Sequence, residues 1–284
     1  MDLSPETLTR MLEGEVPDLP EMADEARRRH CGDPVHIRGI IEFSNSCSRN
    51  CAYCGLRRDN RRLERYAMST GEIIDVAGQA ADAGVRTIVL QSGECDAEDP
   101  EHLARVVAKI KAHSPVAVTL SVGVKPAGAC RLWRRAGADR YLLKYEVADS
   151  ALYAAFHPDS SLYDRLSALA RLRSFGYQIG GGNIIGLPGQ SLDDLLEDIC
   201  LAHELDLDMA AFGPFVPHAD TPLANAPPGD IELALRVVAV ARLVLGPVHI
   251  PATTAFDSLA PDGRERALRM GANVVMANIT PVRY

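Results

Sequence analysis

The chain of 284 residues lacks the long apolar runs that a membrane protein needs. One of its longest apolar stretches, residues 237–245, is interrupted by Arg242 and falls well short of the ~18 apolar residues that span a bilayer. The N-terminus carries Asp2, Glu6 and Glu13 rather than basic residues followed by an apolar run. We therefore expect a protein with neither a membrane span nor a secretory signal, located in the cytoplasm.

Basic residues are fewer than acidic residues, and lysine is especially rare. The 30 basic residues include only four lysines, and 38 acidic residues leave a formal net charge of −8. A protein that binds the phosphate backbone of nucleic acids usually carries a positive surface, so we expect no nucleic-acid partner. Hydrophobic residues make up 47% of the chain and charged residues 24%, which is typical of a packed globular protein and excludes a disordered or collagen-like one.

Cysteine is present in a pattern that does not suit disulfide bonds. The seven cysteines are odd in number and four of them are scattered. This distribution favours a reduced, intracellular protein over a disulfide framework. The other three, Cys47, Cys51 and Cys54, lie within eight residues. This cluster is the most informative feature of the composition.

Strand-like and helix-like segments alternate along most of the chain. Several expected strands are nearly continuous apolar runs, which is typical of a parallel sheet covered on both faces. We expect strands at residues 35–43, 86–90, 117–121, 140–146, 178–185, 209–216, 249–255 and 273–279. The intervening segments predict helices, including 69–84, 100–113, 150–156, 162–174, 192–205, 231–245 and 263–270. Eight such units predict an α/β fold of the closed (β/α)8 barrel (TIM) type.

The two ends of the chain depart from this repeat. Residues 1–34 predict a short helical extension, with Ser4 as the cap of one helix and residues 21–29 as another. Residues 35–284 form the expected barrel domain. The sequence stops at Tyr284, five residues after the eighth expected strand, so we expect the final helix to be missing.

The three clustered cysteines follow the first expected strand with the spacing C-x3-C-x2-C. In a barrel this position is the mouth, at the carboxyl ends of the strands, where active sites lie. A 4Fe–4S cluster usually takes four protein ligands, so three cysteines leave one iron open to another molecule. The alternative is a structural zinc site with Cys31 or His30 as a distant fourth ligand. We favour the open cluster because a second C-x2-C pair is absent.

Other polar residues are expected at the same mouth. Glu94 ends the second strand region and Glu146 the fourth, while Arg165 follows in a helical segment and suits bidentate binding of a carboxylate. The alternatives are a plain strand-to-loop turn at Glu94, a surface residue at Glu146 and a solvated helix charge at Arg165. Three glycines, 180–182, suggest either a closely approaching ligand or tight packing. His218 and Asp220 are weak metal-ligand candidates in a Pro-rich loop.

The cysteine spacing, with Tyr53 just before the last cysteine, resembles the radical S-adenosylmethionine (SAM) superfamily. The resemblance implies that the open iron of a 4Fe–4S cluster binds SAM and that its reductive cleavage yields a 5′-deoxyadenosyl radical. It also implies cofactor contacts from two further motifs, one of which contains Ser92, Gly93 and Glu94. The other is G-x-I-x-G, with Gly182 and Ile184. Lys144, Glu146 and Arg165 complete the implied SAM site.

A narrower set of strings is similar to the E-type maturases of FeFe-hydrogenase. They lie at residues 54–60, 87–94, 137–143, 186–190, 213–215, 217–218, 221–225 and 250–255. The resemblance implies a role in assembling the hydrogenase H-cluster from an iron-containing small molecule, a cysteine-bound iron carbonyl cyanide. It further implies two partners, a tyrosine-cleaving radical SAM maturase and a scaffold GTPase. The implied substrate cavity is lined by Thr119, Ser121, Thr253, Thr254 and Tyr284.

The chain differs from that family at Lys144–Tyr145, where Arg-His is usual. Lysine keeps the positive charge but loses the planar fork of arginine. Two other functions stay open on the sequence alone. One is a radical mutase resembling methylornithine synthase, which would act on lysine. The other is a non-catalytic iron–sulfur carrier.

Overall fold

The computed structural model describes residues 3–97 and 99–284. Its strands form one parallel sheet in the order β6-β5-β4-β3-β2-β1-β8-β7. The strands are β1 (His36–Ser44), β2 (Thr87–Ser92), β3 (Ala117–Ser121), β4 (Arg140–Leu142), β5 (Gln178–Ile185), β6 (Met209–Pro214), β7 (Pro251–Ala252) and β8 (Val274–Asn278). The two outer strands of this order meet at a bridge between Met209 and His249, so the sheet curls into a nearly closed barrel. The expected (β/α)8 barrel is confirmed.

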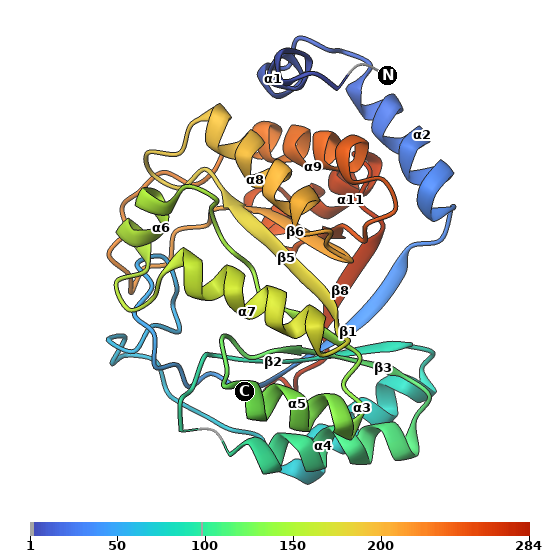
Figure 1. Cartoon of the computed structure of the whole chain (residues 1–284), viewed down its shortest axis with the longest axis vertical. Coiled ribbons are helices and arrows are strands. Elements are labelled where there is room, and N and C mark those ends of the chain that lie inside the picture. The colour runs from blue at the N-terminus through green and yellow to red at the C-terminus, as the bar shows by residue number, and fades with distance from the viewer. Residues whose placement is uncertain (1–2, 98) are drawn as a thin grey trace.

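Helices surround the sheet, as Figure 1 shows. They are α1 (Pro5–Glu13), α2 (Leu19–Cys31), α3 (Thr70–Asp82), α4 (Pro100–His113), α5 (Ala127–Ala136), α6 (Ser150–Phe156), α7 (Leu162–Ser174), α8 (Leu192–Glu204), α9 (Ile231–Leu245), α10 (Thr254–Leu259) and α11 (Gly263–Arg269). The N-terminal α1 and α2 pack against α9 and share its buried core through Leu12 and Ala23. In the part of the chain that the structure describes, no helix is both long and apolar enough to cross a bilayer.

Local signals in the sequence explain most helix starts. Ser4 accepts a hydrogen bond from the Thr7 amide at the start of α1. Ser69 and Glu72 form a reciprocal capping box at the start of α3, as the sequence predicts. Both devices satisfy amide groups that the first helical turn leaves without partners. The bounds of α4, α6, α7 and α9 agree with prediction for the same reason.

Four expected strands are shorter than predicted: β6 and β8 by two residues each, and the fourth and seventh by more. The fourth was expected over residues 140–146, but β4 ends at Leu142, and Glu146 has a left-handed backbone with φ of 72°. A non-glycine residue in that region breaks the regular pleat of a strand. The seventh was expected over residues 249–255, but β7 holds two residues, one of them Pro251, which has no amide hydrogen to donate.

A short helix therefore replaces the end of the seventh expected strand. Thr253 is the residue before α10, and Thr254 is its first residue. The burial of Phe256 on this helix favours the turn over a continued strand. The prediction that Thr253 and Thr254 lie on strand seven is thus wrong, although both stay at the carboxyl end of the barrel.

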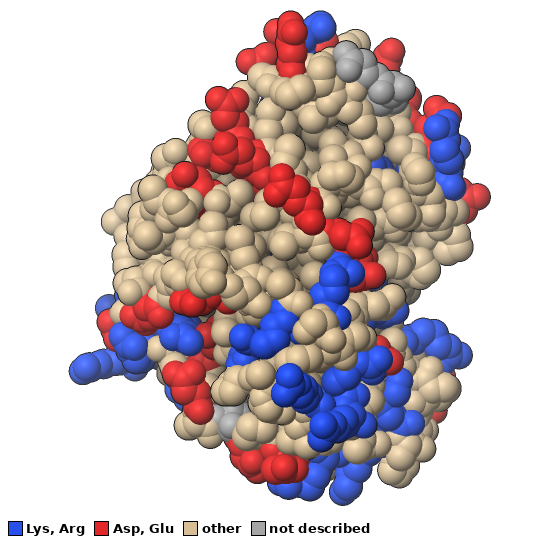
Figure 2. Space-filling view, viewed as in Figure 1, with Lys and Arg blue, Asp and Glu red and all other residues tan. Residues whose placement is uncertain are grey.

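Charge is segregated on the face drawn in Figure 2. Acidic side chains form a diagonal band over α8, whose sequence contains Asp193, Asp194 and Glu197. Cationic side chains gather lower on this face, over α4 and α5, where Arg131 and Arg135 are exposed. The net charge of −8 therefore does not describe this face, which has one acidic and one basic region.

Candidate functional site

A cavity of about 500 Å³ opens at the carboxyl ends of the strands. It brings together side chains from β1, β2, β3, the β4–α6 connection and α7, which parallel strands place at one end of the barrel. Of the residues predicted for the site, it is lined by Cys47, Cys51, Tyr53, Cys54, Ser92, Gly93, Glu94, Ser121, Lys144, Glu146, Arg165 and Tyr284. Elements far apart in sequence thus meet in one space.

The cysteine loop after β1 is held firmly at this mouth. All three cysteines are half-buried and unpaired. The Ala52 amide donates to the Phe156 carbonyl (2.9 Å), and the Ser48 amide donates to the Glu94 carbonyl (2.7 Å). Gly93 is required here, because an added Cβ would lie 2.4 Å from the Ser46 carbonyl oxygen. The loop and the end of β2 are therefore packed backbone against backbone.

The thiols themselves suit iron rather than proton chemistry. Burial, together with the neighbouring Cys54 and Glu146, raises the pKa of Cys51 to about 12. Burial also raises the pKa of Cys54. These two thiols would stay protonated alone, whereas bound iron deprotonates its cysteine ligands. The donor set therefore fits a 4Fe–4S cluster held by Cys47, Cys51 and Cys54.

The proposed fourth ligands for zinc lie at the opposite end of the barrel. Arg242 donates to the Cys31 sulfur over 3.3 Å, and His30 lines a separate cavity beside Gly246. Neither can reach the cysteine loop, so this zinc alternative is wrong. Among residues 3–97 and 99–284, no three His, Cys, Asp or Glu side chains lie close enough to hold a single metal ion. A cubic cluster needs wider spacing, because each cysteine binds a different iron.

Glu94 is buried between two arginines. Its Oε1 lies 2.5 Å from Arg49 Nε, and its Oε2 lies 3.8 Å from Arg165 Nη2. An added Cβ on Gly123, whose φ is +77°, would overlap the carboxylate at 2.3 Å. The carboxylate thus has little freedom and faces the cavity with its charge already partly balanced. Sequence reasoning did not single out Arg49, although its position between two of the clustered cysteines was a signal.

Arg165 connects the carboxylates of the site to its aromatic residues. Its Nε donates to the Tyr153 hydroxyl (2.9 Å) and its Nη1 to the Lys144 carbonyl (3.0 Å), and the side chain is 9% exposed. Glu146 Oε2 lies 3.0 Å from Lys144 Nζ in an ion pair whose angles do not suit a hydrogen bond. Buried arginines normally keep such partners. The alternative of a solvated helix charge does not hold for Arg165.

His157 is a site residue that the sequence did not reveal. Tyr53 Oη and His157 Nε2 are 2.8 Å apart, and His157 Nδ1 lies 2.9 Å from the Tyr153 carbonyl. Because a carbonyl only accepts, Nδ1 donates and Nε2 accepts from Tyr53. Burial lowers the pKa of His157 and raises that of Tyr53, so both are neutral. No motif surrounds His157, which closes α6 ahead of Pro158.

The glycine run in β5 is explained by packing. An added Cβ on Gly180 would meet Met209, and one on Gly182 would lie 2.0 Å from the Ala211 carbonyl oxygen. The clash is with β6 in both cases, so the packing alternative accounts for these glycines. Ile184 faces a smaller cavity of about 170 Å³ next to the main one.

The residues predicted to hold the substrate are divided among three places. Ser121 and Tyr284 line the main cavity, whereas Thr253 and Thr254 line the smaller one, which shares Tyr53 and Lys144 with it. Thr119 is buried, and its hydroxyl has no hydrogen-bond partner among the described residues. The structure also adds Glu42, which accepts from Gln91 (3.2 Å) and Asn278 (3.0 Å) and lines the main cavity.

His218 and Asp220 do not form a metal site. An added Cβ on Gly55 would lie 2.6 Å from His218 Nε2, and Asp220 pairs with Arg62 over 3.0 Å. Both residues brace the segment after the cysteine loop.

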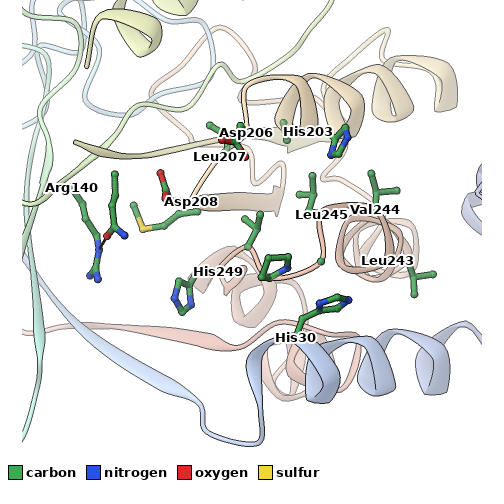
Figure 3. Close-up of a pocket in the computed structure, with 16 residues that line it drawn as sticks. His30, Arg140, His203, Asp206, Leu207, Asp208, Leu243, Val244, Leu245 and His249 are labelled. Carbon is green, nitrogen blue, oxygen red and sulfur yellow. Dashed lines mark hydrogen bonds between the residues drawn. The ribbon is translucent and has the colours of Figure 1, made fainter. Parts of the chain in front are cut away.

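A larger cavity of about 660 Å³ lies at the amino ends of β4–β7, away from the cysteines. Figure 3 shows His30, His203 and His249 around it, together with Arg140 and Asp208. Burial and the charge of Arg38 lower the pKa of His249 to about 4. Of the residues predicted for the cysteine site, this cavity contains only His30, the rejected zinc ligand.

Comparisons with known proteins agree with the geometry. Residues 41–202 match the radical SAM superfamily. The chain is 50% identical to the FeFe-hydrogenase maturase subunit HydE of Thermotoga maritima, over 94% of this chain and 76% of that protein. It is 27% identical to 3-methylornithine synthase of Methanosarcina acetivorans, over 93% and 75% respectively.

Solved structures show the same fold. A crystal structure of methylornithine synthase superposes with a TM-score of 0.91 at 25% identity, covering 100% of this chain and 85% of the other. The FeFe-hydrogenase maturase HydG of Carboxydothermus hydrogenoformans gives 0.81 at 20% identity, covering 95% and 66%, which shows the fold alone. The chain belongs to the radical SAM superfamily and, within it, to the HydE family of maturases, and it is a radical SAM enzyme with a 4Fe–4S cluster and SAM as its cofactors.

Proposed function

We propose that this enzyme matures FeFe-hydrogenase by acting on a cysteine-bound iron carbonyl cyanide with a SAM-derived radical. One observation carries the proposal: the cysteine loop and the predicted substrate residues Ser121 and Tyr284 line a single cavity. A radical must react where it forms, so the cofactor and the substrate need a shared, enclosed space. Membership of the HydE family, at 50% identity to the Thermotoga maritima protein, supports the same role.

Cys47, Cys51 and Cys54 would hold the cluster, and its open iron would face the cavity. When bound, the cluster and SAM together supply a 5′-deoxyadenosyl radical. We assign Glu94 and Glu146 to the amino end of SAM and Arg165 to its carboxylate, because a buried charge needs a partner of opposite sign. The neutral Tyr53–His157 pair places an aromatic ring beside the cofactor without adding charge. Ser92, Gly93, Gly182 and Ile184 are the remaining proposed cofactor contacts.

The substrate end is suited to an anionic iron compound. Ser121 offers a hydroxyl donor in the main cavity, and Tyr284 lines it with its ring while its hydroxyl donates to Glu72 Oε1 (2.8 Å). Lys144, which is paired with Glu146, lies at the boundary with the smaller cavity. Thr253 and Thr254 line that smaller cavity, and Thr119 carries a buried hydroxyl without a partner among the described residues. Donors of this type bind cyanide and carboxylate groups by hydrogen bonds.

The Thermotoga maritima relative is named as a maturase subunit, which supports action together with other maturases. We propose that this enzyme takes its substrate from a tyrosine-cleaving radical SAM maturase and passes its product towards a scaffold GTPase. The seven unpaired cysteines support work in a reducing compartment such as the cytoplasm. We also propose that residues 1–34 are an extension and that residues 35–284 are the catalytic barrel.

The test is an anaerobic assay of the reconstituted protein with SAM and a reductant. With a synthetic cysteine-bound iron carbonyl cyanide, we expect release of 5′-deoxyadenosine and consumption of the iron compound. With the other maturases and apo-hydrogenase, we expect hydrogenase activity that depends on this protein. The Cys51→Ser variant is the control and is expected to support neither.

Lysine is the second substrate to try, because the chain superposes closely on methylornithine synthase and because Glu42 places a carboxylate in the cavity. We expect lysine to be unchanged. Formation of methylornithine, with the iron compound unreacted, would contradict the proposed substrate.

A further inference from the structure

Asp198 on α8 is a buried carboxylate that none of the assignments above uses. Its side chain is 0% exposed. Its Oδ1 accepts from the Ala148 amide (2.5 Å), and its Oδ2 accepts from Asn183 Nδ2 (2.6 Å) and Gln190 Nε2 (3.2 Å). A carboxylate is tolerated in the interior only when donors of this kind surround it. The three donors therefore converge on Asp198 for a structural reason.

The donors come from the two segments that border the proposed SAM site. Ala148 lies in the connection between β4 and α6, and Tyr145 in the same connection donates its hydroxyl to the Asp198 carbonyl (2.5 Å). Asn183 lies in β5, and Gln190 lies in the turn that follows β5. One residue of α8 thus joins two segments that are 35 or more residues apart in sequence.

Glu146 lies between Tyr145 and Ala148, the two residues of the β4–α6 connection that are hydrogen-bonded to Asp198. Its backbone has the left-handed φ of 72°, which a non-glycine residue adopts only when its surroundings enforce it. Its amide donates to the Gly182 carbonyl and its carbonyl accepts from the Ile184 amide, both over 2.9 Å. Tyr145 and Ala148, on either side, are the residues that Asp198 holds. The bonds to Asp198 therefore help to fix the direction of the Glu146 side chain.

Gln190 links Asp198 to the second segment, which is the end of β5 and the turn that follows it. Its Oε1 accepts from the Gly186 amide (2.7 Å), and its Nε2 donates to the Ile184 carbonyl (3.1 Å) as well as to Asp198. An amide that makes all these bonds has one orientation only. Asp198 selects that orientation, and the turn that follows β5 is ordered as a result.

We propose that Asp198 is a positioning residue for SAM: it fixes Glu146 and the turn after β5 without touching the cofactor. The inference rests on the proposed SAM site at the barrel mouth. A carboxylate can accept all three hydrogen bonds, whereas an amide of the same size has one acceptor oxygen and turns an N–H group towards other donors.

The test compares Asp198→Asn with Glu197→Gln, a matched change of the exposed neighbour on the same helix. Both are made in the full chain, reconstituted anaerobically, and assayed for iron content, thermal midpoint and the dissociation constant of SAM. We expect Asp198→Asn to raise that dissociation constant by about tenfold or more with iron content unchanged, and Glu197→Gln to leave it unchanged. Unchanged SAM affinity in Asp198→Asn would overturn the proposal, and so would a loss of affinity in proportion to lost iron.

If Asp198→Asn does not fold, Asn183→Ala replaces it, because it removes the side-chain amide that donates to Asp198 Oδ2. A smaller rise in the SAM dissociation constant, with full iron content, supports the proposal, and no rise overturns it. Failure of the proposed function would appear differently: the reconstituted protein without any substitution would not bind SAM at all.

Discussion

The two ends of the barrel differ more in chemistry than in size. The mouth holds three cysteines and buried carboxylates in about 500 Å³, whereas the amino end holds histidines and Arg140 in about 660 Å³. At the mouth, burial raises the pKa of the Cys51 and Cys54 thiols, so they become thiolates only when they bind a positive metal centre. At the other end, burial and neighbouring arginines lower the pKa of His249, which keeps it neutral. The donor set, rather than the volume, therefore locates the reaction.

The largest expected difference between the two ends follows loss of a cysteine. Cys51→Ser removes a cluster ligand, so we expect loss of the cluster and no detectable 5′-deoxyadenosine. Cys31→Ser is the matched change at the amino end, where the sulfur accepts from Arg242 and donates to the Pro247 carbonyl. It should keep full iron content and activity. Equal losses in both variants, measured by iron analysis and product chromatography, would contradict the comparison.

An arginine at each end gives the next contrast. Arg165→Lys loses the bonds to Tyr153 and Lys144 and the fork suited to a carboxylate, so we expect SAM affinity to fall by about 10-fold to 100-fold. Arg140→Lys removes bonds to Gln178 and Thr87 instead. We expect it to leave SAM affinity unchanged. Equilibrium dialysis of the reconstituted variants with SAM measures this affinity. A larger loss of affinity in Arg140→Lys than in Arg165→Lys would contradict the assignment of Arg165 to the SAM carboxylate.

Two threonines should respond in opposite ways to removal of a hydroxyl. The Thr119 hydroxyl is buried without a hydrogen-bond partner among residues 3–97 and 99–284, so Thr119→Val should leave the free energy of unfolding unchanged or raise it by about 1 kcal/mol. It should nevertheless slow turnover of the iron compound. Thr87→Val removes an acceptor of Arg140, so stability should fall and turnover should be kept. Urea unfolding and substrate consumption measure the two effects; a stability loss in Thr119→Val would show that its hydroxyl is a core group.

The smallest effect is a pH dependence at the amino end. The pKa of His249 is lowered from 6.5 to about 4, so between these values the unfolded chain binds the proton more readily than the folded protein does. Stability from this group is therefore complete above pH 6.5 and is lost as the pH falls towards 4. His249→Gln should flatten the stability profile in that window. SAM cleavage at pH 7.5 should be unchanged, and an unaltered profile would contradict the assignment.

The sequence predicts regular elements well where the signals are local. The capping box of Ser69 and Glu72 and the apolar run of β2 depend on neighbouring residues only. The early end of β4 depends on the left-handed Glu146, which is held by β5 and α8, and α10 depends on the burial of Phe256. Contacts of that kind are set by tertiary structure and leave no local pattern.

The site residues likewise fall into those that local motifs predict and those that only tertiary contacts reveal. The three cysteines and Glu94 are recognisable from short motifs at strand ends, and the structure places them around one cavity. His157 and Asp198 act through partners that the fold brings together from distant segments. Thr253 and Thr254 were found by resemblance, yet their strand was assigned wrongly because the ladder ends at Ala252 and α10 begins at Thr254.

The most direct test of the central claim is electron paramagnetic resonance of the reduced, reconstituted protein with SAM labelled by ¹⁵N in its amino group. We expect a 4Fe–4S signal that shifts when SAM is added and that shows hyperfine coupling to the labelled nitrogen, since only three cysteines bind the cluster. A signal indifferent to SAM, or bound zinc in place of iron, would contradict the account.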